Sequence, residues 1–113
     1  MRLSEIVSEL DLKVVCDGGD LDREITSGYT SDLMSDAIAR LEPGALWVTL
    51  QVHVNVVAIG SMKDVGAVLL TRGREPNKDT LEKAQEEGVP IATTELGAFE
   101  LIGKLHDLGI RGT

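Results

Sequence analysis

The sequence predicts an α/β fold of three layers, in which helices cover both faces of a mostly parallel sheet. From residue 26 onward, segments patterned as strands alternate with segments patterned as helices, as in repeated β–α–β units. Two of the strand segments, 45–50 and 67–71, are almost entirely apolar, which is typical of parallel strands buried on both faces. One Trp, one Tyr and one Phe occur among 113 residues, so the predicted core is built mainly from aliphatic side chains.

The N-terminal third predicts a helix, two strands and a second helix. Apolar residues recur at helical spacing across residues 3–10, which predicts a short helix with one buried face. Residues 13–16 and 25–30 have the composition of strands and are separated by a glycine-rich turn. The pair Ser31 and Asp32 is in position to cap a helix over residues 33–41, because both side chains accept hydrogen bonds from free N–H groups.

Residues 53–61 are ambiguous. Their valine-rich composition favours a strand, whereas their position between two buried strands requires a crossover helix. We predict a helix here, with Val56, Val57 and Gly60 facing the sheet.

The C-terminal part continues the alternation. After the strand at 67–71, the pattern predicts a helix over 78–87 that ends at Gly88, since glycine readily adopts the left-handed conformation of a helix end. A short strand over 89–93 follows, and Thr94 is predicted to cap the last helix. The shared face of that helix is predicted to carry Phe99, Ile102 and Leu105 or His106.

Composition excludes several classes of partner. Nineteen acidic and eleven basic residues give a net charge of −8, which argues against nucleic acid and against an anionic membrane surface. No apolar run approaches the length of a membrane span, and the N-terminus is amphipathic rather than patterned as a signal peptide. Cys16 is the only cysteine, so no internal disulfide can form and we expect a cytoplasmic protein.

Motifs for catalysis are absent. The sequence holds no phosphate-binding P-loop, no dinucleotide-binding glycine motif and no serine nucleophile elbow. Its one cysteine and two histidines lie far apart in the sequence and lack the spacing of zinc ligands. We therefore expect neither a cofactor nor a metal, and a chain that is not an enzyme.

Polar residues follow the predicted parallel strands, where open α/β sheets bind their ligands. Each such segment precedes a helix N-terminus, whose free N–H groups favour anions. The residues that we expect to contact a ligand are Ser31, His53, Asn55, Thr71, Arg72, Gly73 and Arg74. Two other interpretations remain open at this point. The threonines could be caps while the arginines pair with nearby carboxylates, and His53 could be a structural histidine.

Four stretches together resemble a known family. They are residues 25–35 (Ile-Thr-Ser-Gly-Tyr-Thr-Ser-Asp-Leu-Met-Ser), 43–49 (Pro-Gly-Ala-Leu-Trp-Val-Thr), 69–76 (Leu-Leu-Thr-Arg-Gly-Arg-Glu-Pro) and 89–94 (Val-Pro-Ile-Ala-Thr-Thr). The chain resembles a stand-alone DRTGG domain over nearly its whole length, residues 1–113, and we expect it to be one such domain. DRTGG domains occur beside CBS domains in regulated pyrophosphatases, in some phosphotransacetylases and on their own. The second half is similar to the N-terminal, non-catalytic domain of HPr kinase/phosphorylase, and the first half to the N-terminal domain of Mur ligases, so these folds are expected.

This chain departs from the motif that names the family. Val52 and His53 stand where Asp-Arg is usual, and Thr71, Arg72 and Gly73 stand where Thr-Gly-Gly is usual. The chain therefore shares only Thr71 and Gly73 with the motif, and we expect any site in this chain to use His53 and Asn55 instead.

The resemblance implies a non-catalytic regulatory or interaction domain that forms a homodimer and senses an anionic or nucleotide-type metabolite. Two other functions fit the sequence less closely. One is a scaffold that binds only protein, such as a subunit of a redox or signalling complex. The other is an unrecognised enzyme that uses His53.

Overall fold

The computed structural model describes the whole chain, residues 1–113, and contains the five strands and five helices that the sequence predicts. The helices are α1 (Leu3–Glu9), α2 (Met34–Arg40), α3 (Asn55–Met62), α4 (Lys78–Glu87) and α5 (Ala98–Asp107). The strands are β1 (Lys13–Cys16), β2 (Ser27–Thr30), β3 (Ala45–Thr49), β4 (Ala67–Leu70) and β5 (Ile91–Thr93). No helix combines the length and the apolar character that crossing a membrane requires.

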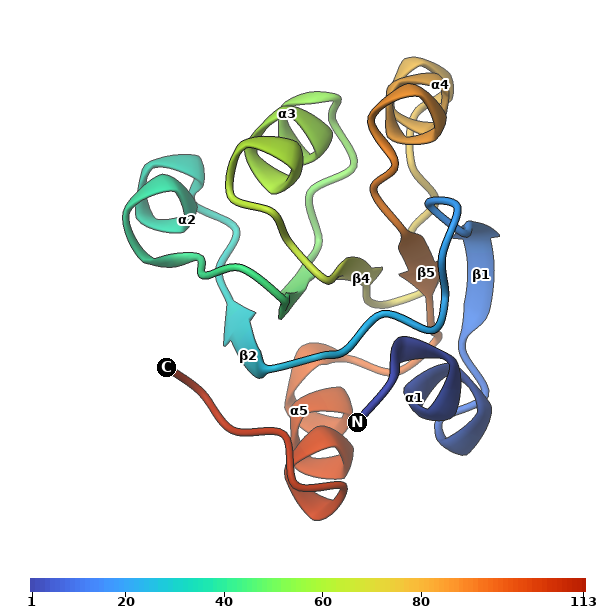
Figure 1. Cartoon of the computed structure of the whole chain (residues 1–113), viewed down its shortest axis with the longest axis vertical. Coiled ribbons are helices and arrows are strands. Elements are labelled where there is room, and N and C mark those ends of the chain that lie inside the picture. Colours follow the sequence, from blue (N-terminus) through green and yellow to red (C-terminus); the bar gives the residue numbers. More distant parts are fainter.

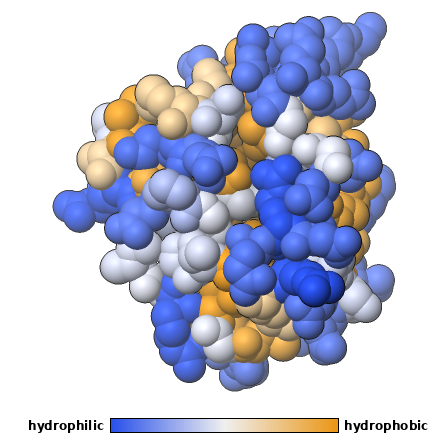
Figure 2. Space-filling view, in the orientation of Figure 1, coloured by the Kyte–Doolittle hydropathy of each residue, from blue (hydrophilic) through white to orange (hydrophobic).

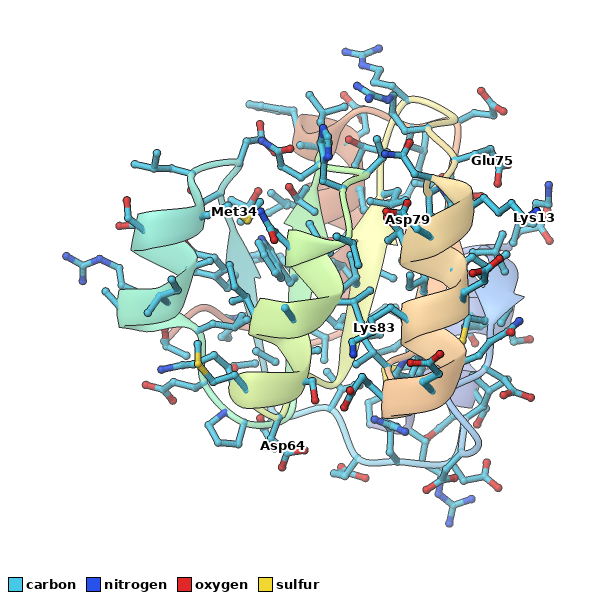
Figure 3. The ribbon with its side chains drawn as sticks, turned by 90° about the horizontal axis from the view of Figure 1, so that it is seen from above. Lys13, Met34, Asp64, Glu75, Asp79 and Lys83 are labelled. Carbon is cyan, nitrogen blue, oxygen red and sulfur yellow. The ribbon has the colours of Figure 1, made fainter.

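The strands form one sheet in the order β1-β5-β4-β3-β2, in which only β1 is antiparallel to its neighbour. Helices α2, α3 and α4 lie on one face of the sheet, and α1 and α5 lie on the other (Figure 1). Seen from the three-helix side, α2, α3 and α4 lie next to one another across the sheet (Figure 3). The predicted three-layer, mostly parallel fold is confirmed.

The core consists of two apolar clusters, one on each face of the sheet. Every residue of β3 and β4 is buried, and Trp47 is the largest side chain with no exposed surface. The crossover between these strands is a helix, as predicted, and Val56, Val57 and Gly60 are all buried against the sheet. A Cβ at Gly60 would lie 2.9 Å from Val65 Cγ1, so the absence of a side chain there allows close packing.

Two predicted helix caps are wrong, for the same reason. Helix α2 has Leu33 at its N-cap, and the Ser31 hydroxyl instead accepts the Leu33 N–H at 3.0 Å. Helix α5 has Gly97 at its N-cap, and the Thr94 hydroxyl accepts the Leu96 N–H at 3.2 Å. Both side chains therefore close a small turn before the helix begins.

The buried face of α5 also differs from the prediction. Leu101 and Leu105 are buried, whereas Phe99 is 89% exposed. Because α5 starts three residues later than the cap prediction implied, Phe99 lies in its first turn and outside the contact with the sheet.

Edge strand β2 is held to α2 by its one aromatic residue. The Tyr29 hydroxyl donates to Asp36 Oδ2 at 2.5 Å, and Asp36 Oδ1 accepts from Arg40 Nε at 3.2 Å. Partial burial of the phenol raises the pKa of Tyr29, and the hydrogen bond to the Asp36 carboxylate raises it further, because both disfavour the phenolate.

We expect the tyrosinate absorbance of the folded protein to appear with a midpoint above the ordinary tyrosine pKa of about 10. Tyr29 is the only tyrosine, so a spectrophotometric titration reports on this one side chain. Its contribution to stability should be complete below about pH 10 and lost as the pH rises through the higher, folded-state pKa. The same titration in urea is the control, and a folded midpoint at or below the unfolded one would contradict the Tyr29–Asp36 contact.

Candidate functional site

The carboxyl ends of β3 and β4 bring two of the predicted segments side by side. The Thr71 N–H donates to the Thr49 carbonyl at 3.3 Å, directly beyond the paired ends of the two strands. Farther out, the Val52 carbonyl accepts both the Asn77 N–H at 3.1 Å and the Thr80 hydroxyl at 2.7 Å. The loop that carries His53 is therefore fixed to the loop that carries residues 71–77.

Helix α3 presents free donors at this edge. Its N-cap, Val54, has no side chain that could cap the helix, and the N–H groups of His53, Val54 and Asn55 have no acceptor. The side chains of His53 and Asn55 are exposed and make no hydrogen bond. Each of the other four helices has an acidic residue in its first turn, but α3 has none. The positive end of the α3 dipole is thus uncompensated.

The guanidinium groups of Arg72 and Arg74 lack partners. Neither forms an ion pair or a hydrogen bond, so the interpretation that they pair with nearby carboxylates is not supported. The acidic residue next to them in the loop, Glu75, instead pairs with Lys13 of β1 at 3.2 Å (Figure 3). Two positive charges therefore stand unpaired in a chain whose net charge is −8.

Arg72 lies against the start of α5. A Cβ on Gly97, the N-cap of α5, would come within 2.7 Å of Arg72 Nη2 and 2.8 Å of its Cζ. The guanidinium therefore covers Gly97 in the space that a side chain would fill. The guanidinium and the helix N-terminus are both positive, and the acidic residue in the first turn of α5 is Glu100.

The predicted role of Gly73 is not available to a ligand. Gly73 has a positive φ of 67°, as we expected, but its N–H donates to the Thr94 carbonyl at 2.8 Å, and the Arg72 N–H donates to the Leu96 carbonyl at 2.9 Å. The Glu95 carboxylate also lies against Gly73, 2.6 Å from where a Cβ would be. The close approach that glycine permits is therefore made by the protein's own loop.

Ser31 and Thr71 contribute little to a binding surface. Thr71 is 1% exposed. The Ser31 carbonyl accepts Trp47 Nε1 at 3.0 Å, and its hydroxyl closes the turn before α2. Between Ser31 and the α3 start, Asp32 Oδ1 accepts the Thr49 hydroxyl and the Leu50 N–H, both at 2.8 Å. Of the seven predicted residues, the side chains free to meet a ligand are those of His53, Asn55, Arg72 and Arg74.

Sequence reasoning missed the main hollow of the molecule. A groove of about 760 Å³ runs beside β2, and a smaller hollow of about 390 Å³ lies near the start of β1 and the end of β5. None of the seven predicted residues lines either hollow. The groove depends on which strands the helices leave uncovered, and no local sequence pattern signals that.

The comparisons with known proteins agree with the fold. The sequence pattern of the DRTGG domain matches residues 5–108. The chain belongs to the DRTGG domain family. None of the curated proteins matches it.

A similar solved structure is the CBS and DRTGG domains of the regulatory region of a Clostridium perfringens pyrophosphatase, complexed with its activator diadenosine tetraphosphate. The match has a TM-score of 0.75 at 14% sequence identity and covers 90% of this chain. It covers 44% of the pyrophosphatase chain, so this DRTGG chain spans less than half of that structure. At this identity the likeness establishes the shared fold.

We expect Asp32→Ala to lower the free energy of unfolding by about 1–2 kcal/mol, because the Thr49 hydroxyl and the Leu50 N–H lose a charged acceptor. Thr49 is buried, although Asp32 itself is exposed, so water can replace only part of the loss. Urea unfolding measures the difference. Asp32→Asn, which keeps an acceptor oxygen, should lose less, and an alanine variant as stable as the parent would show that this network does not hold the edge together.

Proposed function

We propose that this chain is a non-catalytic regulatory domain that binds a small phosphate-bearing metabolite beyond the carboxyl ends of β3 and β4. The observation that carries the proposal is the pair of unpaired guanidiniums, Arg72 and Arg74, on a loop fixed to the uncapped start of α3. A phosphate would bring the anion that both groups lack. The N–H groups of residues 53–55 can donate to its oxygens, and an arginine fork can bind it in two places at once.

The nucleotide class is supported by the relative. The regulatory region of the pyrophosphatase is complexed with diadenosine tetraphosphate, its activator. In this chain, the exposed side chains of His53 and Asn55 could contact a base or a ribose hydroxyl beside the phosphate. The function we propose is therefore sensing of a nucleotide-type metabolite by one DRTGG domain that uses no cofactor and works in the cytoplasm.

An enzyme that uses His53 is less well supported. A histidine base is normally oriented by a carboxylate or carbonyl on its second nitrogen. The His53 ring is exposed and makes no hydrogen bond, so nothing fixes its tautomer or its direction.

We expect the double variant Arg72→Ala and Arg74→Ala to bind ADP or pyrophosphate at least tenfold more weakly than the parent, because charge-assisted hydrogen bonds contribute roughly 1.5–3 kcal/mol each. Isothermal titration calorimetry measures the dissociation constants. The control is Arg2→Ala, which removes another exposed arginine without a hydrogen bond from its guanidinium. Equal binding by the double variant and the parent, or no binding of either probe by the parent, would contradict the proposed site.

We further propose that the domain forms a homodimer through the same edge. Three large apolar side chains are exposed beyond the carboxyl ends of the parallel strands: Leu33 (64%) after β2, Leu50 (38%) after β3, and Phe99 (89%) in the first turn of α5. Apolar side chains gathered on one side of a molecule are typical of an interaction surface, and two-fold dimers are the most common soluble assemblies. A scaffold that binds only protein would use the same surface with a different partner.

We expect Phe99→Ser to shift the protein from dimer to monomer, because it removes the most exposed large apolar side chain of this edge. Light scattering at tens of micromolar reports the mass. Met62→Ser is the matched control, since Met62 is 62% exposed but ends α3 at the opposite edge of the sheet. A parent protein that is monomeric would contradict the dimer, and a dimer that survives Phe99→Ser would place the interface elsewhere.

A further inference from the structure

The groove beside β2 has the size and position of a binding site. Its volume of about 760 Å³ lies within the range of small-molecule sites, about 300–1,000 Å³. Strand β2 lies along it, α5 and the C-terminal residues 110–113 form one wall, and the end of α2 forms the other. Apolar residues reach the surface next to α2 and α5, in contrast to the hydrophilic surface of α4 (Figure 2).

The groove is open because β2 is an edge strand with little cover. On its outer side, the Gly28 N–H donates to the Arg111 carbonyl at 2.8 Å, and Ile110 packs against Gly28. Thr30, two residues farther along β2, is exposed. Its main-chain N–H points to the same side as that of Gly28. Beside this strand, the half-buried side chain of Ile102 gives the groove an apolar surface.

The charged residues that line the groove are mainly basic, although the chain as a whole is acidic. Three Lys or Arg side chains from separate elements line it, Arg40, Lys63 and Arg111, together with His106. The one acidic side chain of the lining is Glu42, although acidic residues outnumber basic ones by nineteen to eleven in the chain. Arg40 is paired with Asp36 and Arg111 donates to the His106 carbonyl. Lys63 and the His106 ring have no partner.

From this geometry we propose that the groove binds a small organic anion that joins an apolar ring to a phosphate, of the size of a nucleoside monophosphate. The ring would lie on the half-buried Ile102, and the phosphate would meet Lys63 and His106. A second copy of the chain fits less well, because a two-fold pairing of β2 with itself would bring the same basic side chains face to face. The groove shares no residue with the site proposed at the carboxyl ends of β3 and β4. An experiment can therefore exclude either site without excluding the other.

The test is a titration of the ¹⁵N-labelled full chain, followed by amide chemical shifts, with AMP as the probe and with adenosine and inorganic phosphate as its two halves. AMP should shift the amides of Thr30, Lys63 and Ile102 with a dissociation constant below about 1 mM. Each half should bind at least tenfold more weakly. AMP shifts confined to residues 53–55 and 72–74 would support the edge site and overturn the groove.

Lys63→Glu reverses one charge of the lining and should weaken AMP binding in the groove at least tenfold. Lys104→Glu is the matched control, because Lys104 lies near the end of α5, as the half-buried Lys63 lies at the end of α3, but Lys104 does not line the groove. The control should bind as the parent does. Equal binding by both variants, or no shift of the groove amides at 5-fold the expected dissociation constant, would overturn the proposal.

Discussion

The handedness of the β–α–β crossover determines most of this structure. Strands β2, β3, β4 and β5 are neighbours in the sheet in the order of the sequence. Because each crossover is right-handed, connections that all advance in one direction place all three crossover helices on the same face (Figure 1). Only α1 and α5 remain to cover the other face. Two short helices do not extend under all five strands, and the groove lies beside the edge strand β2.

The same constraint explains where the hollows are. In doubly wound sheets the strand order reverses, and a crevice opens at the carboxyl ends where the helices part to opposite faces. Here the order of β2 to β5 never reverses, so no such crevice forms and the loops after β4 and β5 close on each other. The Arg72 and Gly73 N–H groups bond to carbonyls of the next loop. The carboxyl ends of the strands therefore offer exposed side chains rather than a crevice, and the groove of about 760 Å³ lies beside β2.

Local patterns predicted the elements well and their ends less well. The continuous apolar runs at β3 and β4 predicted two strands that are buried on both faces. Residues 53–61 were predicted as a helix from their position between these strands, because their composition alone favoured a strand. Gly88 was predicted from the chemistry of helix ends and has a φ of 69°. Asp32 could not be predicted, because its partners, Thr49 and Leu50, lie seventeen and eighteen residues away. Strand order predicted that the seven residues follow the carboxyl ends of the parallel strands, but their hydrogen bonds depend on contacts between loops.

Residue 72 differs from the family motif, and the difference adds a positive charge near the carboxyl ends of the strands. The Thr-Gly-Gly pattern has glycine where this chain has Arg72, yet Arg72 keeps a left-handed backbone with φ of 58°, next to Gly73 at 67°. Two successive left-handed residues let this loop bond to the one after β5, and glycine adopts that conformation without strain. An L-residue in that conformation costs roughly 1–2 kcal/mol, and the guanidinium gains no ion pair within the chain. Arg72 therefore keeps the hydrogen bonds of this loop at a conformational cost that glycine would not have.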